Sequence, residues 1–206
     1  MRRLYLDVPY SEREVARRLG ARWDTERRRW FVPPDIDPSP LLGWSKASTS
    51  VNARAHHYLL LETRHACEHC AGSARVHGIV LPAGHEIRML GDGPGDDEWE
   101  RSDDPTLLSF VTSLDATVAQ RLRQASLFYR PRSAFFGSVP YYYNHCDLCG
   151  GCLSEHALFG TPGLGFDVLS ECDARAIEVT TVHAGFAGCA EHFSYGVTFL
   201  DAMRHR

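Results

Sequence analysis

Four cysteines in two short pairs are the residues whose spacing points most directly to chemistry. Each pair has the form Cys-x-x-Cys: Cys67 with Cys70, and Cys146 with Cys149. Such a turn brings two thiolates to one metal ion, and two turns complete the tetrahedral four-sulfur shell of a structural zinc. Because four sulfurs leave no open coordination position, the sequence predicts one structural Zn²⁺ per chain and not a catalytic metal.

The two pairs are also compatible with a different chemistry. Iron accepts four sulfurs as well, and the thiols could be redox-active or simply buried. A thioredoxin-type motif requires a strand, Cys-x-x-Cys and a helix in a βαβ unit, whereas each pair here follows an expected strand and lies near a turn. The 75 residues between Cys70 and Cys146 exceed the ~15–20 of an ordinary ribbon. We therefore expect a split zinc ribbon with an insertion.

Three further cysteines bring the total to an odd number, which argues against a disulfide framework. Cys152 lies three residues after Cys149 and could replace a ligand, but we expect it to be spare. Cys172 and Cys189 stand among apolar neighbours and are predicted to be buried free thiols. A second site made by these three cysteines with His192 is the alternative.

An enzyme is less favoured but is not excluded by the sequence. A catalytic zinc would need three protein ligands and a water, and no His-Glu-x-x-His motif occurs. A cysteine nucleophile with a histidine base stays open, because such pairs meet in space and not in sequence. His65, His69 and His145 flank the cysteine pairs and are expected to lie around the metal.

Composition indicates a globular protein with one domain and a small module. The chain has 206 residues, of which 44% are hydrophobic and 23% charged. No apolar run approaches the ~18 residues of a membrane span, and the charged start lacks the apolar stretch of a signal peptide. These features predict a cytoplasmic protein, and the mixture of strand and helix signals predicts an α+β fold.

The first 44 residues are predicted to form a strand–helix–strand module. Alternating apolar residues indicate a strand over 4–8, and Ser11 with Glu14 forms a capping-box pattern before a helix over 12–19. Gly20 suits the left-handed residue that ends a helix. A second strand is expected over 29–32, after a turn at 24–26.

This module is basic, whereas the remainder of the chain is acidic. Residues 1–30 hold nine arginines against five acids, and the other residues hold thirteen basic side chains against twenty-one acids. Arginines beside Trp23 and Trp30 offer phosphate contacts and stacking faces for single-stranded nucleic acid. Alternatively, the tryptophans form the core of a small unit and the arginines a solvated rim. The arginines concerned are Arg17, Arg18, Arg22, Arg27, Arg28 and Arg29.

A linker is expected over 45–54, followed by the zinc-ribbon-like domain over 55–206. Strands are predicted over 58–63, 75–81, 139–144 and 177–182. The acidic, glycine-rich segment 91–104 is predicted to be a loop. Asp104 and Pro105 suit the start of a helix, and the apolar spacing that follows predicts an inserted helical hairpin over about 105–129.

Two resemblances support this division. The segment LYLDVPYSEREVARRLGARWDTERRRWFVP resembles a small bacterial module often appended to plasmid-mobilisation primases and other DNA-processing proteins. Its Gly-x-x-Trp-Asp…Trp part is similar to the HARP module of annealing helicases, which implies contact with DNA. The two cysteine regions resemble the halves of a split zinc ribbon in uncharacterised bacterial proteins that carry the same module. Where those proteins tend to read Cys-Gly-Ala-Leu-Gln-Gly-Asp, this chain reads CGGCLSE from Cys149.

The sequence therefore predicts a zinc-stabilised, non-enzymatic binding protein whose basic N-terminal module contacts nucleic acid. One alternative is a protein–protein adaptor or an accessory protein of a mobile element, with a protein as its partner. The other is a metal-dependent hydrolase or a thiol redox enzyme.

Overall fold

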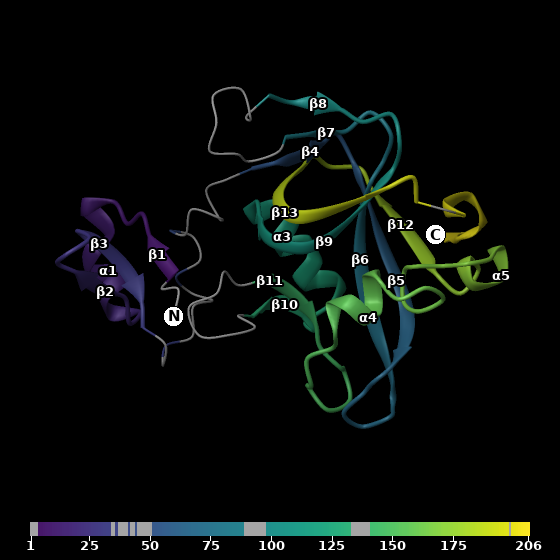
Figure 1. Ribbon diagram of the computed structural model, residues 1–206, viewed down its shortest axis with the longest axis horizontal. Helices are drawn as coiled ribbons and strands as arrows, with labels where there is room; N and C mark the ends of the chain where they lie inside the picture. Colours follow the sequence, from purple (N-terminus) through teal and green to yellow (C-terminus); the bar gives the residue numbers. More distant parts are fainter. Residues whose placement is uncertain are drawn as a thin grey trace.

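The structure is a computed structural model that describes residues 4–33, 36, 41, 44, 51–88, 98–132, 141–197 and 199–206. Strands dominate its element order and a few short helices lie between them (Figure 1). The predicted α+β class is therefore confirmed. In the described residues, no helix has the length and apolar character needed to cross a membrane.

The N-terminal module, called the head from here on, is a small sheet with a helix on one face. Its antiparallel sheet has the order β1-β3-β2, and Trp30 pairs with Leu6 on one side and Trp23 on the other. The elements are β1 (Leu4–Leu6), the 3-10 helix η1 (Tyr10–Glu12), α1 (Arg13–Arg18), β2 (Arg22–Asp24) and β3 (Arg29–Val32). The head has an apolar core of its own, made by Leu6, Ala16, Ala21, Trp30, Val32 and Leu41.

The head confirms some sequence expectations and corrects others. The strand over 29–32 is present, and Gly20 has the left-handed conformation with φ +100°. The capping box is not formed, because a 3-10 turn begins at Tyr10 and no side chain caps either helix. The expected turn at 24–26 is present from Thr25 onward, and Asp24 is the last residue of β2. Strand β2 was not predicted from the sequence, because Arg-Trp-Asp shows no alternation of apolar and polar residues.

The rest of the chain, called the body, is built on one nine-stranded sheet. Its order is β14-β12-β5-β6-β9-β13-β4-β7-β8, and all neighbours are antiparallel except β12 and β14. The strands are β4 (Ala53–Ala55), β5 (Tyr58–Ala66), β6 (Ser73–Leu81), β7 (Glu86–Ile87), β8 (Glu100–Arg101), β9 (Thr106–Leu114), β12 (Glu178–Val182), β13 (Phe186–Tyr195) and β14 (Arg204–His205). β4 begins inside the stretch expected to be a linker.

Both faces of the central strands are covered. One apolar cluster contains Leu59, Val80 and Leu107, and the other contains Tyr58, Ile79 and Leu108, so that neighbouring residues of β5, β6 and β9 point into different clusters. The second cluster includes Val118 and Leu122 of α3 (Ala116–Ala125). The first includes residues of α4 (Glu155–Phe159) and α5 (Glu171–Ala174).

The helical hairpin predicted over 105–129 is wrong in its first half. Thr106–Leu114 is the strand β9, which lies between β6 and β13 in the sheet. Its apolar residues have helix-like spacing because a strand buried on both faces carries no simple alternation. The helix start is not Asp104 but Asp115, whose carboxylate accepts hydrogen bonds from Thr117 N at 2.7 Å and Val118 N at 2.9 Å. The second half is helical, as expected, over Ala116–Ala125.

The remaining elements join the central sheet to the second cysteine pair. β10 (Tyr129–Arg132) and β11 (Tyr141–Asn144) form a separate antiparallel ribbon. The chain ends with the 3-10 helix η3 (Leu200–Ala202) before β14. Of the predicted loop over 91–104, residues 91–97 lie outside the described residues, and Glu100–Arg101 forms β8.

Candidate metal centre

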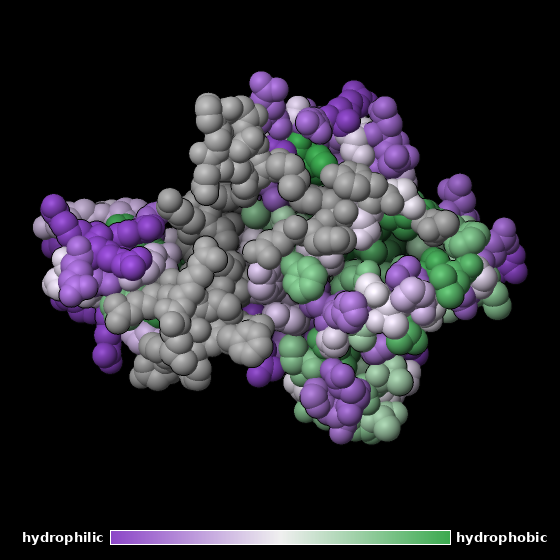
Figure 2. Space-filling model, viewed as in Figure 1, coloured by the Kyte–Doolittle hydropathy of each residue, from purple (hydrophilic) through white to green (hydrophobic). Residues whose placement is uncertain are grey.

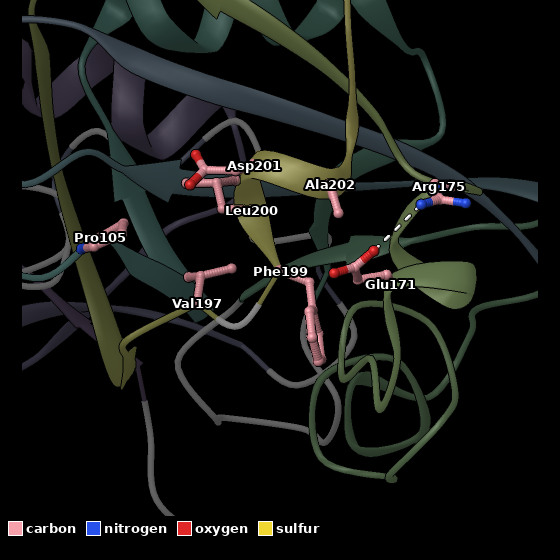
Figure 3. Close-up of a pocket in the computed structure, with 8 residues that line it drawn as sticks. All are labelled: Pro105, Glu171, Arg175, Val197, Phe199, Leu200, Asp201 and Ala202. Carbon is pink, nitrogen blue, oxygen red and sulfur yellow. Dashed lines mark hydrogen bonds and ion pairs between the residues drawn. The ribbon is translucent and has the colours of Figure 1, made fainter.

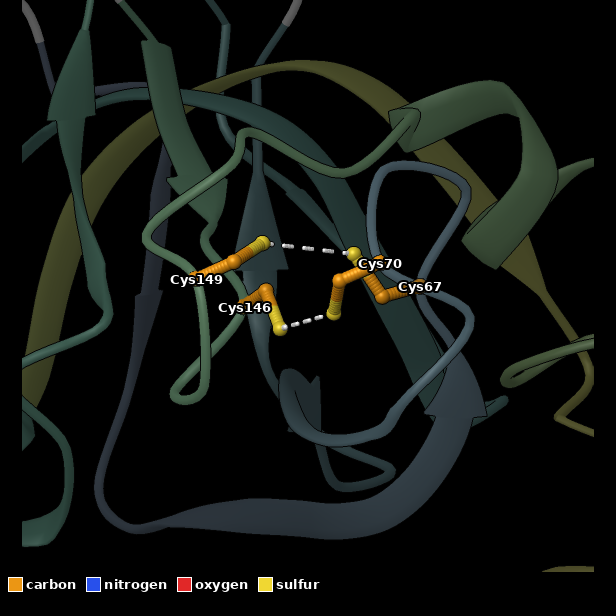
Figure 4. A group of neighbouring side chains, drawn as sticks. All are labelled: Cys67, Cys70, Cys146 and Cys149. Atoms are coloured by element: carbon orange, nitrogen blue, oxygen red, sulfur yellow. Dashed lines mark hydrogen bonds between the residues drawn. The ribbon is translucent and has the colours of Figure 1, made fainter.

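The four predicted cysteines meet at one point of the body, as Figure 4 shows. Their sulfur atoms all lie within 4.8 Å of one another. Cys67 Sγ is 3.7 Å from Cys149 Sγ, and Cys70 Sγ is 3.8 Å from Cys146 Sγ. Sulfurs at ~2.3 Å from a tetrahedral zinc would be about 3.8 Å apart. The four cysteines therefore make one possible metal site whose size fits a four-sulfur shell.

The first pair lies in the loop of the β5–β6 hairpin. Cys67 N donates to Gly72 O and Ala71 N donates to Cys67 O, both at 2.8 Å, which closes a tight turn around the pair. The amide of His69 points at Cys67 Sγ at 3.4 Å. Ala71 has a φ of +57°, a conformation in which a non-glycine residue is strained. The hairpin thus holds both sulfurs and an amide donor in a fixed loop.

The second pair repeats this geometry after β11. Cys146 N donates to Gly151 O and Gly150 N donates to Cys146 O, again at 2.8 Å. The amide of Leu148 points at Cys146 Sγ at 3.4 Å. Gly150, with φ +73°, occupies the position that Ala71 has in the first turn. Glycine adopts this conformation readily, whereas Ala71 adopts it without that freedom.

The two turns also pack against each other in a reciprocal way. A Cβ on Gly72 would lie 2.5 Å from Leu148, and a Cβ on Gly151 would lie 2.4 Å from the His69 ring. The His69 ring is also 2.8 Å from the carbonyl oxygen of Cys152. A larger residue at either glycine would clash with a side chain that lies between the two cysteines of the other pair, namely Leu148 or His69. The contact fixes the distance between the turns independently of any ion.

Without a cation, the thiols of the sulfur cluster have different pKa values. The pKa of Cys67 is lowered to about 7: burial acts against this, but amides of His69 and Cys70 and neighbouring thiols donate to its sulfur. The Gly72 amide lowers the pKa of Cys70, but burial and the three other thiols together raise it to about 12. Four adjacent thiolates repel one another, and a divalent cation at the centre removes that repulsion. The donor set therefore favours a bound metal.

The histidines around the pairs take structural positions. His145 is buried, and its Nδ1 lies 3.1 Å from both Phe128 O and Tyr143 O. Burial lowers the pKa of His145, so the ring is held neutral next to Cys146. His65 is half-buried on β5. None of the three contributes an atom to the sulfur cluster found among the described residues.

The three other cysteines have different surroundings. Cys152 is half-buried outside the cluster, as expected for a spare cysteine, and its backbone bridges to His145. Cys189 is buried, as predicted. Cys172 is exposed on α5, so the prediction of a buried thiol is wrong there: its turn of helix faces solvent. The side chain of His192 lies outside the described residues, and no second metal cluster occurs among those described.

A hollow of about 700 Å³ is lined by none of the four clustered cysteines. Figure 3 shows its lining, in which Glu171 and Arg175 form an ion pair at 3.2 Å and Phe199 contributes an aromatic side chain. The remaining lining residues are Pro105, Val197, Leu200, Asp201 and Ala202. Among the described lining residues, the one cation, Arg175, is paired to Glu171, and no acid, base and nucleophile are assembled there.

Glu155 is a buried titratable residue of the body that the sequence did not point to. It is 4% exposed at the start of α4, and its Oε1 has no hydrogen-bond partner. Oε2 accepts a long bond of 3.4 Å from the amide of Phe110, a non-glycine residue with φ +52°. Burial raises the pKa of Glu155 to about 8. The sequence signal is weak, because a glutamate in a first helical turn is ordinarily exposed.

We expect Glu155→Gln to stabilise the protein at high pH. The pKa of Glu155 is raised in the folded state, so folding takes up a proton between the ordinary pKa and about 8, and stability falls as pH rises through that window. The gain from glutamine should be about 2–4 kcal/mol at pH 9 and below ~1 kcal/mol at pH 5. Urea unfolding at both pH values measures it, with the exposed Glu171→Gln as control. Equal gains at both pH values would contradict the assignment.

The head arginines differ in their exposure and in their ion pairs. Arg17, Arg18, Arg22, Arg27 and Arg28 are exposed, and Figure 2 shows the hydrophilic colouring of the head. Arg29 is half-buried and pairs with Asp7 at 2.6 Å. Within the described part of the chain, Arg18, Arg22 and Arg28 take part in no ion pair. Trp30 is in the core at 8% exposure, as one interpretation required, whereas Trp23 is 47% exposed.

Fold and site together define an α+β protein with a small basic head and a body that carries a four-cysteine possible metal site. Residues 3–46 match the family described as "Domain of unknown function (DUF5710)". Two proteins of Escherichia coli described as "DNA primase TraC" are similar to part of the chain. One is 46% identical over 55 residues, which cover 26% of this chain and 5% of that protein. The other is 42% identical over 48 residues, which cover 23% and 3%.

These similarities concern only a small part of the relatives. The chain spans 5% and 3% of the length of the two primases it matches. No solved structure matches the chain. The expected likeness of the N-terminal segment to a primase-associated module is confirmed, and the description of the body as a zinc ribbon stays a prediction.

Proposed function

We propose that this protein is a non-enzymatic nucleic-acid-binding protein whose body is stabilised by one structural zinc ion. The head, residues 1–44 in this proposal, makes the contact. The domain over 55–206 holds the zinc through Cys67, Cys70, Cys146 and Cys149. The observation that carries the proposal is the set of exposed head arginines without ion pairs, on a module similar to part of a DNA primase.

The existing contacts of each arginine decide how it can take part in binding. Arg18, Arg22 and Arg28 are free to reach phosphates, since no acid among the described residues holds them. Arg27 lies 5.4 Å from the Tyr5 ring and Arg17 lies 3.5 Å from Glu14, so both are partly engaged yet exposed. Arg29 is held by Asp7 and supports the sheet more than it offers charge. An arginine fork suits phosphate oxygens.

Zinc is proposed because of the ligand set and its position. Four thiolates in two Cys-x-x-Cys turns are the usual shell of a structural zinc site, which leaves no place for a catalytic water. The thiol with the lowered pKa, Cys67, is buried, whereas a redox-active cysteine must be reached by its substrate. The geometry therefore favours a structural ion over a hydrolase or a thiol oxidoreductase.

A protein–protein adaptor is the second candidate. The body carries the acidic excess of the chain and exposes Leu127, Leu164 and Leu169 at its surface. Exposed large apolar side chains on a body with an excess of acids suit a basic protein partner. In this case the similarity to a primase segment would mark an accessory protein of a mobile element.

Binding of the full chain to a labelled 30-mer duplex and a labelled 30-mer single strand tests the proposal. We expect micromolar binding at 50 mM salt and a linear fall of log K with log salt. The adaptor candidate predicts instead a stoichiometric protein in a pull-down that nuclease does not release. Absence of binding to both nucleic acids at 50 mM salt would contradict the proposed function.

A further inference from the structure

Of the paired tryptophans Trp23 and Trp30, Trp23 is the one that lies outside the apolar core of the head. It is 47% exposed, whereas its cross-strand neighbour Trp30 is 8% exposed. The two rings lie 5.6 Å apart at 69°, an edge-on contact and not a face-to-face stack. Trp30 therefore supports the indole of Trp23 at one side and leaves nearly half of it open to solvent.

The backbone that carries Trp23 is fixed by its neighbour Asp24. The Asp24 carboxylate accepts hydrogen bonds from the amides of Glu26 at 3.1 Å and Arg27 at 3.0 Å, which shapes the turn after β2. Its other oxygen accepts from the Tyr5 hydroxyl at 2.9 Å, across the sheet. An exposed ring on a fixed backbone loses little conformational freedom on binding, which favours its use as a contact.

The charges around Trp23 indicate what kind of partner covers it. Arg22 precedes it on the edge strand β2, so that the two side chains leave opposite faces of the sheet. Arg18 ends the helix before β2, and Arg28 lies in the turn to β3; all three arginines are exposed and belong to no ion pair in the described residues. An exposed tryptophan alone would suit an apolar protein surface equally well. With three exposed, uncommitted arginines on the segment around it, and with Arg17 lying 5.9 Å from the ring of its neighbour Trp30, the complementary partner is a polyanion that also offers flat apolar faces, which describes a nucleic acid.

We propose that the head binds single-stranded nucleic acid in preference to duplex, with a base stacked on Trp23. This inference rests on the proposed function and specifies that the nucleic acid is single-stranded. Base faces are open in a single strand, whereas in a duplex they are covered by neighbouring bases, and inserting a side chain requires unstacking. The helix α1 has six residues, about 9 Å of length, too short to fill a major groove as recognition helices do.

Fluorescence anisotropy with the full chain tests the inference. The probes are a labelled oligo-dT of twenty nucleotides, an oligo-U of the same length and a blunt duplex of twenty base pairs, all at 100 mM salt. The variants are Trp23→Leu, which keeps apolar volume without an aromatic face, and Trp23→Phe, which restores a face. Tyr10→Leu is the matched control: that ring is 80% exposed, but the Arg13 guanidinium lies 3.7 Å above it.

We expect at least tenfold tighter binding to a single strand than to the duplex. Trp23→Leu should lose about tenfold of the single-strand affinity with duplex affinity unchanged, Trp23→Phe should recover most of the loss, and Tyr10→Leu should bind like the wild type. The two single strands show whether DNA or RNA supplies the bases. Equal single-strand binding by Trp23→Leu, or duplex binding as tight as single-strand binding, would overturn the inference yet leave nucleic-acid binding intact. No binding to any probe overturns the proposed function as well.

Discussion

Replacing Cys146 by serine is expected to remove the metal from the body and to lower its melting temperature by about 10 °C or more. Cys146 is fully buried between β11 and the β5–β6 hairpin, and its sulfur lies 3.8 Å from that of Cys70. Serine cannot replace a thiolate in a four-sulfur shell. The loss releases the ion and leaves three adjacent thiols whose repulsion no cation offsets.

Thermal unfolding followed by circular dichroism, together with zinc content by elemental analysis, measures this effect. Cys172→Ser is the matched control, since that thiol is exposed and outside the cluster. It should keep one zinc per chain and the wild-type melting temperature. A Cys146→Ser protein that melts with the wild type, or that keeps its zinc, would mean that the cluster does not stabilise the body through a metal.

Removing the three uncommitted head arginines together is expected to produce the largest loss of nucleic-acid affinity. The change is Arg18→Ala, Arg22→Ala and Arg28→Ala in one chain, and affinity at 50 mM salt should fall by about 10- to 100-fold. Each lost phosphate contact lowers the slope of log K against log salt by ~0.7–0.9, so the slope should fall by about 2–3. Anisotropy titrations between 50 and 200 mM salt give both quantities.

A body variant with the same charge change provides the comparison. Arg121, Arg123 and Arg130 are exposed on α3 and β10. Changing these three to alanine removes an equal charge from a surface that we do not assign to nucleic acid. If this variant loses as much affinity and as much slope as the head variant, binding reflects total charge and the head is not the contact surface.

Local features of the chain predicted several elements well. The hairpin that carries Cys67 and Cys70, the strand before Cys146 and the helix over Ala116–Ala125 all follow from apolar spacing and turn residues. The meeting of the four cysteines also follows from spacing, because each Cys-x-x-Cys turn can serve only half of a four-sulfur shell.

Features that depend on tertiary burial could not be read from the sequence. β9 resembles a helix in its spacing because both of its faces are covered: Leu107 lies in one apolar cluster and Leu108 in the other. Its position in the sheet means that the first half of the predicted helical hairpin is part of the central sheet. The exposure of Trp23 and the burial of Glu155 likewise depend on which neighbours the fold brings to them.

X-ray absorption at the zinc edge of the purified full chain, with elemental analysis of the same sample, tests the central claim most directly. The account predicts one zinc per chain with four sulfur neighbours at about 2.3 Å and no nitrogen or oxygen neighbour. A shell that mixes sulfur with nitrogen or oxygen, or a folded protein without metal, would contradict it. The cysteines and the histidines beside them would then become candidates for chemistry in place of structure.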